Sequence, residues 1–185
     1  MKKRYNYTLI IASFLIFISC SENATGPGNL RLNQGEGAFT VSGAINAQHE
    51  GKAWDKIDRS DNGTLLQIFV SNAEFSNDPH ENGDASFVLE FRLESGSESF
   101  SISKGEYNLG ADAPFHGLFA DAATTMAFET NGESGGFIAI TSYYSTGSVE
   151  AEFDFSASTI DGGSSVTVSG GIRASCIGGQ YNPNC

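Results

Sequence analysis

The feature that most constrains the fold of this chain is a regular alternation of apolar and polar residues in short runs. In the clearest run, residues 149–157, Val149, Phe153 and Phe155 alternate with acidic and hydroxyl side chains. Successive side chains of a β-strand point to opposite faces of a sheet, so this pattern buries one face and leaves the other in water. The three-to-four spacing of an amphipathic helix is hard to find anywhere in the chain. The sequence therefore predicts an all-β fold.

Turn-forming residues divide the chain into many short strands. Besides 149–157, the strands predicted most clearly are 87–93 and 166–172, and further strands are predicted at 39–47, 52–57, 65–71, 99–103, 125–129 and 137–143. Their separators include Asn131-Gly132 and Asp161-Gly162-Gly163, which tolerate the positive φ angles of tight turns. Such spacing predicts an antiparallel β-sandwich or barrel of about eight or nine strands, and periodicity alone does not separate the two.

Two stretches are predicted to be loops. Residues 72–85 are polar, and residues 110–123 carry Phe115, His116 and Phe119 between small and turn-forming residues.

The first twenty residues have the parts of an export signal. Lys2, Lys3 and Arg4 precede an apolar run at 9–18, and a small residue stands before Cys20. A helix over this run spans about 15 Å, roughly half of a bilayer core. The signal helix is therefore expected to be removed, because it cannot serve as a membrane anchor by itself.

The end of this segment, Phe17-Ile18-Ser19-Cys20, resembles the bacterial lipobox, with Phe17 in place of the usual leucine. The resemblance implies cleavage before Cys20 and attachment of acyl chains such as palmitate, which would anchor the protein to a membrane effectively permanently. Ser21 resembles the pattern that is sorted to an outer membrane, on its periplasmic or surface side. The alternative is an ordinary secretory signal with an incidental cysteine.

The predicted organisation is a signal peptide at 1–19, the lipidated cysteine with a flexible tether at 20–36, and one β-sandwich domain at 37–185. Without the signal, seven basic residues stand against 22 acidic ones, a formal charge of −15. Such a charge repels nucleic acid, so nucleic-acid binding is not expected. Solubility is the simplest explanation of the acidity.

Two further cysteines lie near the carboxyl end. If lipid consumes Cys20, Cys176 and Cys185 remain as a pair in an oxidising compartment, and we predict a disulfide between them. A metal site would need more Cys or His ligands close by.

Catalysis is not expected from the motifs. The nucleophile elbow, the zinc helix and the phosphate-binding loop are all missing from the sequence. Glu150 with Glu152, and Glu90 with Glu94, share a side of their strands and could act as acid and base on a sugar. Alternation with core residues explains both pairs as parts of a solvated face.

Two sets of residues are candidates for binding. Phe115, Phe119 and Tyr144 are candidates for an exposed aromatic platform for a glycan or peptide, against the alternative that these rings belong to the core. The second set, in the 72–85 loop, consists of Asp78, Glu81 and Asp84 as weak candidates for calcium. No other cofactor is expected.

The carboxyl half resembles small bacterial lipoproteins of unknown function. The resemblance rests on the turn at 107–110 (Tyr-Asn-Leu-Gly), the Gly-initiated strand at 147–157 and a final strand at 166–174. It implies a β-sandwich on a lipid anchor and assigns no catalytic residue. The predicted function is that of an envelope lipoprotein with a non-catalytic binding or structural module for a glycan or envelope protein. The alternative is a carbohydrate-active or other envelope enzyme with a site on its loops.

Overall fold

The structure is a computed structural model that describes residues 31–60, 63–73, 79, 84–95, 102–131, 134–143 and 148–176. These ranges form strands and turns and contain no helix, which confirms the all-β prediction. Over the same ranges, no helix is long and apolar enough to cross a membrane. The predicted signal helix and most of the tether lie outside the described residues, so their prediction stands as it was made.

The described residues form eleven strands. Their bounds are β1 Glu36–Gly43, β2 Ala47–Ser60, β3 Gly63–Ser71, β4 Phe87–Ser95, β5 Gly105–Leu109, β6 Phe115–Asp121, β7 Met126–Glu129, β8 Gly136–Tyr143, β9 Val149–Ser158, β10 Ser165–Arg173 and β11 Ser175–Cys176.

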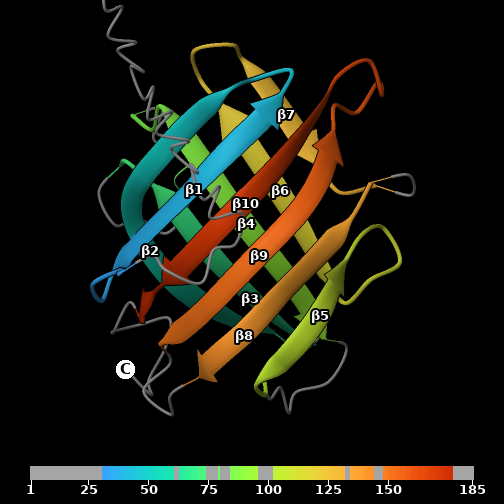
Figure 1. Cartoon of the computed structure of the whole chain (residues 1–185). Helices are drawn as coiled ribbons and strands as arrows, with labels where there is room; N and C mark the ends of the chain where they lie inside the picture. The colour runs from blue at the N-terminus through green and yellow to red at the C-terminus, as the bar shows by residue number, and fades with distance from the viewer. Residues whose placement is uncertain are drawn as a thin grey trace, which may run out of the picture.

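Nine of these strands close into a barrel (Figure 1). Around the ring, the hydrogen-bonded order is β1, β10, β9, β8, β5, β6, β4, β3 and β2, and β2 pairs again with β1. Neighbours in the ring are antiparallel except β5 and β6, which are parallel at one residue pair. The ring closes because β1 lies between β10 and β2 and pairs with both. The structure thus decides for a barrel where the sequence left barrel and sandwich open.

The two ends of the barrel are built from different strands. At one end β9 pairs with β8 over residues 149–155, and β5 joins β8 to the start of β6. At the other end β7 takes this place, because it pairs with β6 over residues 118–121 and with β9 at Ser158. In Figure 1, β7 accordingly lies near the top of the barrel and β5 near the bottom.

Several predicted strands need correction. The predicted strand 39–47 runs through a turn, because β1 ends at Gly43 and β2 begins at Ala47. The predicted strand 52–57 is only the middle of the 14-residue β2. The predicted strand 99–103 lies mostly outside the described residues, and the strand in this region is β5.

The predicted loop 110–123 is wrong, because residues 115–121 form β6. In β6, Phe115, Gly117 and Phe119 are inward positions, and Gly117 interrupts the apolar alternation. A Cβ at Gly117 would lie 3.1 Å from the ring of Phe155. The inward glycine therefore makes room for an aromatic ring of the facing wall, and this is the residue that hides the strand in the sequence.

Phenylalanine rings fill the inside of the barrel. The core contains Phe39, Phe87, Phe91, Phe115, Phe119, Phe128, Phe153 and Phe155, each at most 5% exposed. Contacts between these rings have centroid distances from 4.9 to 6.4 Å. Barrel diameter grows with strand number, so a nine-stranded ring needs bulky side chains to fill it. The interior is a packed core.

Gly170 on β10 shows how the aromatic packing uses glycine. It is in register with Phe39 on one side and Phe153 on the other, and these two rings approach to 6.4 Å. A Cβ at Gly170 would lie 2.3 Å from the backbone oxygen of Ala38. The position therefore has no room for a side chain, and the flanking rings cover it.

The outer face of β2, β3 and β4 carries a second buried cluster of Trp54, Phe69 and Val88. Glu90 of β4 lies on the same face and is 0% exposed. The expectation that Glu90 belongs to a solvated face is therefore wrong, although Glu94 is exposed. Burial of Glu90 is tolerated because Arg92 donates to both carboxylate oxygens and Gln67 donates to Oε1 at 2.7 Å.

Candidate functional site

The structure moves the predicted aromatic platform into the core. Phe115 and Phe119 are both 0% exposed; Phe115 packs against Tyr107 at 5.2 Å, and Phe119 packs against Phe39 at 5.9 Å between ring centroids. These two rings therefore do not form an exposed binding surface. Tyr144 lies outside the described residues.

The other predicted sites fall largely outside the described ranges. Of the calcium candidates, Asp84 is described and exposed, whereas Asp78 and Glu81 are not described. Within the described ranges, no group of three or more His, Cys, Asp or Glu side chains is placed to hold a metal ion. Cys176 is half-buried on β11, and its pairing with Cys185, like lipidation of Cys20, stays a prediction because these partners are not described.

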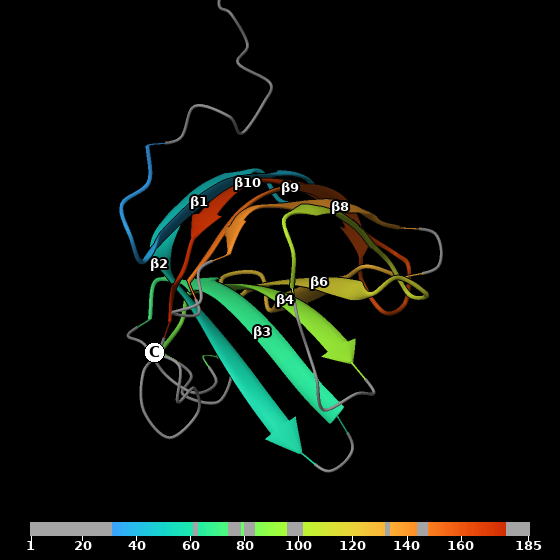
Figure 2. The ribbon, with the colours of Figure 1, turned by 90° about the horizontal axis from the view of Figure 1, so that it is seen from below.

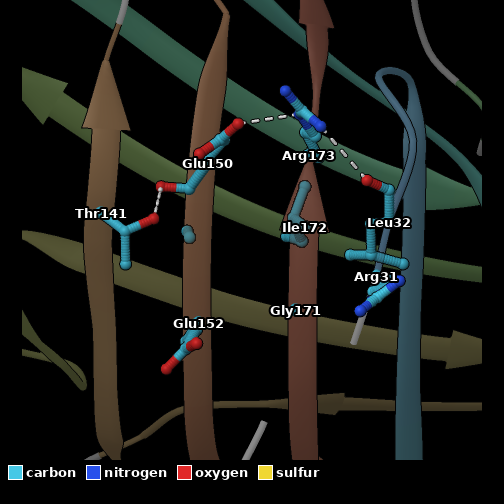
Figure 3. A pocket seen from close by; sticks show the side chains of 9 residues that line it. Arg31, Leu32, Thr141, Glu150, Glu152, Gly171, Ile172 and Arg173 are labelled. Carbon is cyan, nitrogen blue, oxygen red and sulfur yellow. Dashed lines mark hydrogen bonds and ion pairs between the residues drawn. The ribbon is translucent and has the colours of Figure 1, made fainter. Parts of the chain in front are cut away.

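A groove runs over the outer wall of the barrel, where the segment Arg31–Leu32 lies against β1, β2, β9 and β10. It has two arms that share Arg31 and Leu32, one of about 410 Å³ towards β8, β9 and β10 and one of about 430 Å³ towards β1 and β2. Figure 3 shows the first arm, in which Arg173, Glu150 and Glu152 stand on neighbouring strands. We call these two arms the wall groove.

Strand register brings small residues together in the floor of the wall groove. One row across the wall contains Ala139, Glu152, Gly171, Ala38 and Glu50 on β8, β9, β10, β1 and β2. Two neighbouring residues of this row, Gly171 and Ala38, carry little or no side chain, and both are buried. Glu152 and Glu50 stand three strands apart, which is about 14 Å at a spacing of about 4.8 Å per strand.

The adjacent row supplies the fixed charges of the groove. Arg173 Nε lies 2.8 Å from Glu150 Oε1, although its N–H does not point well at that oxygen, and Arg173 Nη1 donates to the backbone oxygen of Leu32 at 3.3 Å. Arg173 thus ties the Arg31–Leu32 segment to β9. Thr141 Oγ1 donates to the backbone oxygen of Glu150 at 3.2 Å (Figure 3).

Two further contacts hold the segment that crosses the wall. The Glu36 carboxylate accepts hydrogen bonds from the backbone N–H and the side-chain amide of Asn33, and these bonds hold the pKa of Glu36 below its ordinary value. Gln34 Nε2 donates to the backbone oxygen of Ala174 at 2.6 Å. The segment that crosses the wall is therefore attached to the barrel on both sides of the wall groove.

The groove suits binding of a polar ligand better than acid–base catalysis. Glu150 and Glu152 are two residues apart on one strand, about 7 Å, a separation that two catalytic carboxyl groups can have. However, Arg173 engages Glu150, and both carboxylates stand on an open outer wall, whereas a catalytic acid usually sits in an apolar pocket. Charges of both signs and the side chain of Thr141 together offer hydrogen bonds along an extended surface.

Two titratable groups whose pKa values are shifted by burial, Asp55 and His49, lie inside the barrel, away from this groove. Burial raises the pKa of Asp55 to about 7. Burial also lowers the pKa of His49, and the charge of Asp121 partly opposes this effect. His49 stacks on Phe87 at 4.3 Å between ring centroids.

Sequence reasoning missed the wall groove because no local motif marks it. Arg31, Glu50 and Arg173 are far apart in the chain and meet only when β1 inserts between β2 and β10. The burial of Asp55 could have been found from a local pattern, since Asp55 is an acidic residue at the inward position between Ala53 and Ile57. Comparison of the chain with protein-family models, with curated proteins and with solved structures finds no match.

Proposed function

We propose that this chain is an exported lipoprotein of the cell envelope, anchored through lipid on Cys20, whose barrel is a non-catalytic binding module. The export signal and the lipobox-like segment before Cys20 support the anchor. Ser21 supports an outer-membrane location. The predicted tether would carry the barrel at some distance from the lipid surface.

The observation that carries the binding role is the wall groove on a barrel whose interior is full. Core rings occupy the space in which a barrel of this size would hold a small ligand. A ligand is therefore expected on the outer wall, where the side chains of Arg31, Arg173, Glu152 and Glu50 offer polar contacts. A glycan or another polar envelope polymer fits such an extended, open surface.

The anchor is tested by acyl labelling. Cells that express the full chain with an alkyne-labelled palmitate analogue are expected to give a labelled, membrane-associated protein, and the Cys20→Ser variant is expected to give an unlabelled one. Cys176→Ser is the matched control, because it removes a cysteine of the barrel and leaves the signal unchanged. Equal labelling of wild type and Cys20→Ser would contradict the proposed anchor.

The binding role is tested by thermal unfolding of the protein with envelope glycans and with calcium. A ligand of the folded state stabilises by RT ln(1 + [L]/Kd), about 2.7 kcal/mol at a hundredfold excess over Kd. We expect a dose-dependent rise of Tm with a glycan that is reduced in Glu152→Ala and kept in Asp154→Ala. Asp154 is the matched control, because it is exposed on the same face of β9 and does not line the groove.

Two results would count against this proposal. A wild-type protein whose Tm no envelope polymer changes would contradict the binding role itself. A shift that is equal in wild type and Glu152→Ala would place the binding surface elsewhere on the barrel.

A further inference from the structure

The chain reaches the barrel through the wall groove. Gly35, the residue before β1, donates its backbone N–H to the backbone oxygen of Arg173 on β10 at 2.7 Å, and its own oxygen accepts from the backbone N–H of Ala53 on β2 at 2.8 Å. Before Gly35, Arg31 and Leu32 line both arms of the wall groove, and Arg173 donates to the backbone oxygen of Leu32. Hydrogen bonds therefore fix this segment to the wall, and the chain that precedes Arg31 starts from the wall groove.

The proposed anchor stands close to this starting point. The ten residues 21–30 lead from the lipid proposed on Cys20, on which the inference rests, to Arg31. This chain reaches at most about 40 Å when fully extended, and a flexible chain of its length has a root-mean-square span of about 18 Å. A compact domain of about 150 residues has a radius of gyration of about 15 Å, so it is about 40 Å across. Even the extended tether is therefore no longer than the barrel is wide.

The wall opposite the groove cannot lie on the membrane. Figure 2 shows β1, β10, β9 and β8 in one layer, and β3, β4 and β6 in the layer across the core. With β3 and β4 on the lipid, the tether would run a quarter of the way round the barrel and then down by one radius, about 50 Å in all. This path is longer than the fully extended tether. The root-mean-square span is shorter than one barrel radius, which favours the wall groove in the half that faces the membrane.

The charge of the wall groove is nearly balanced, unlike that of the whole chain. Arg31, Lys52 and Arg173 line the groove, and they are three of the seven basic residues that follow the predicted signal. Four acidic residues share the lining. The strongly acidic chain as a whole is repelled by an anionic lipid surface. A zwitterionic headgroup suits the groove, because arginine binds phosphate and carboxylates accept hydrogen bonds from an ammonium group.

We propose that the barrel rests on its own membrane through the wall groove, and that the groove binds zwitterionic lipid headgroups that carry a phosphate and an ammonium group, as phosphoethanolamine does. Arg31 and Arg173 meet the phosphate, and Glu50 and Glu152 meet the ammonium group. Weak contacts suffice, because a short tether presents the headgroups at an effective concentration in the millimolar range. This role goes beyond the proposed glycan, and it turns the wall of β3 and β4 away from the lipid.

Carboxyl footprinting of the full-length, acylated protein tests this surface. The protein is placed in vesicles of phosphatidylethanolamine with phosphatidylcholine and, for comparison, in vesicles of phosphatidylglycerol. Exposed carboxylates are then coupled to glycine ethyl ester with a carbodiimide and located by mass spectrometry. We expect about fivefold lower labelling of Glu50 and Glu152 in the zwitterionic vesicles, the protection that follows when the effective concentration is several times Kd. Glu94, which is exposed on β4, should be labelled equally in both.

Two variants remove one positive charge each. Arg31→Ala should lose most of the protection of Glu50 and Glu152 in the zwitterionic vesicles, because it removes a phosphate contact from both arms of the groove. Lys104→Ala is the matched control and should keep the protection, since Lys104 is exposed and does not line the groove.

Three outcomes would overturn this role. Protein that does not float with either kind of vesicle would refute the anchor, and this role with it. Protein that floats but shows equal labelling of Glu50 and Glu152 in both kinds of vesicle would keep the anchor and refute the headgroup as ligand. Protection of Glu94 in their place would put the opposite wall on the membrane.

Discussion

Phe153→Ala is expected to lower the free energy of unfolding by about 3–5 kcal/mol, the range for removing a fully buried ring. Phe153 is 0% exposed and contacts Phe91, Phe155 and Phe39 at centroid distances of 4.9, 6.2 and 6.4 Å. Its neighbour in register on β10 is Gly170, which has no side chain to fill the space. The loss should therefore lie towards the upper end of the range, measured by urea denaturation.

Phe137→Ala is the matched control for this experiment. It removes the same ring from the outer face of the neighbouring strand β8, where Phe137 is only half-buried. Its loss should be clearly smaller. Equal losses for the two variants would contradict the assignment of the barrel interior as the core that holds the fold together.

The second large effect is a dependence of stability on pH that Asp55 causes. Its pKa is about 7 in the folded protein against an ordinary value of 3.8, so the folded state keeps a proton that the unfolded state releases. The contribution of Asp55 to the free energy of unfolding is therefore full below about pH 4, falls as the pH rises towards 7, and stays constant above pH 7. The total loss of unfolding free energy is about 4 kcal/mol, at 1.36 kcal/mol for each pKa unit.

The comparison of wild type with Asp55→Asn isolates this effect. The lowered pKa of His49 acts in the opposite direction, because the unfolded state takes up the proton more readily below about pH 6.5. Both proteins share His49, so the difference between their unfolding free energies at pH 4 and pH 8 belongs to Asp55. A difference that does not change with pH would show that the carboxyl group is solvated or paired in the folded protein.

The strands of this barrel were predictable where the alternation is continuous. The predictions for β3, β4, β8, β9 and β10 are close to the observed bounds, because most of their inward positions carry apolar side chains. β6 was missed because its inward series contains Gly117, whose place is filled by a ring from another strand. The pattern of a single strand shows its own glycine, but it does not show the ring of a distant strand that packs over that glycine.

Neither the closure of the ring of strands nor the wall groove could be predicted from the sequence, and the reason is the same for both. Both depend on β1 pairing with β10, as in the hydrogen bond between Thr40 and Ser169, 129 residues apart. No local pattern carries that pairing. The burial of Glu90 was missed for a related reason, since it depends on Gln67 of the adjacent strand β3 as well as on Arg92.

The position of β1 between β2 and β10 also determines when this protein can fold. As the chain emerges from the ribosome, β1 can pair with β2 at once, but its other edge has no partner until residue 173 has been made. Pairing across such a long loop is slow, typically milliseconds to seconds for β-rich topologies. The barrel therefore cannot close while the chain is being made, and it completes its fold only after the last long strand arrives.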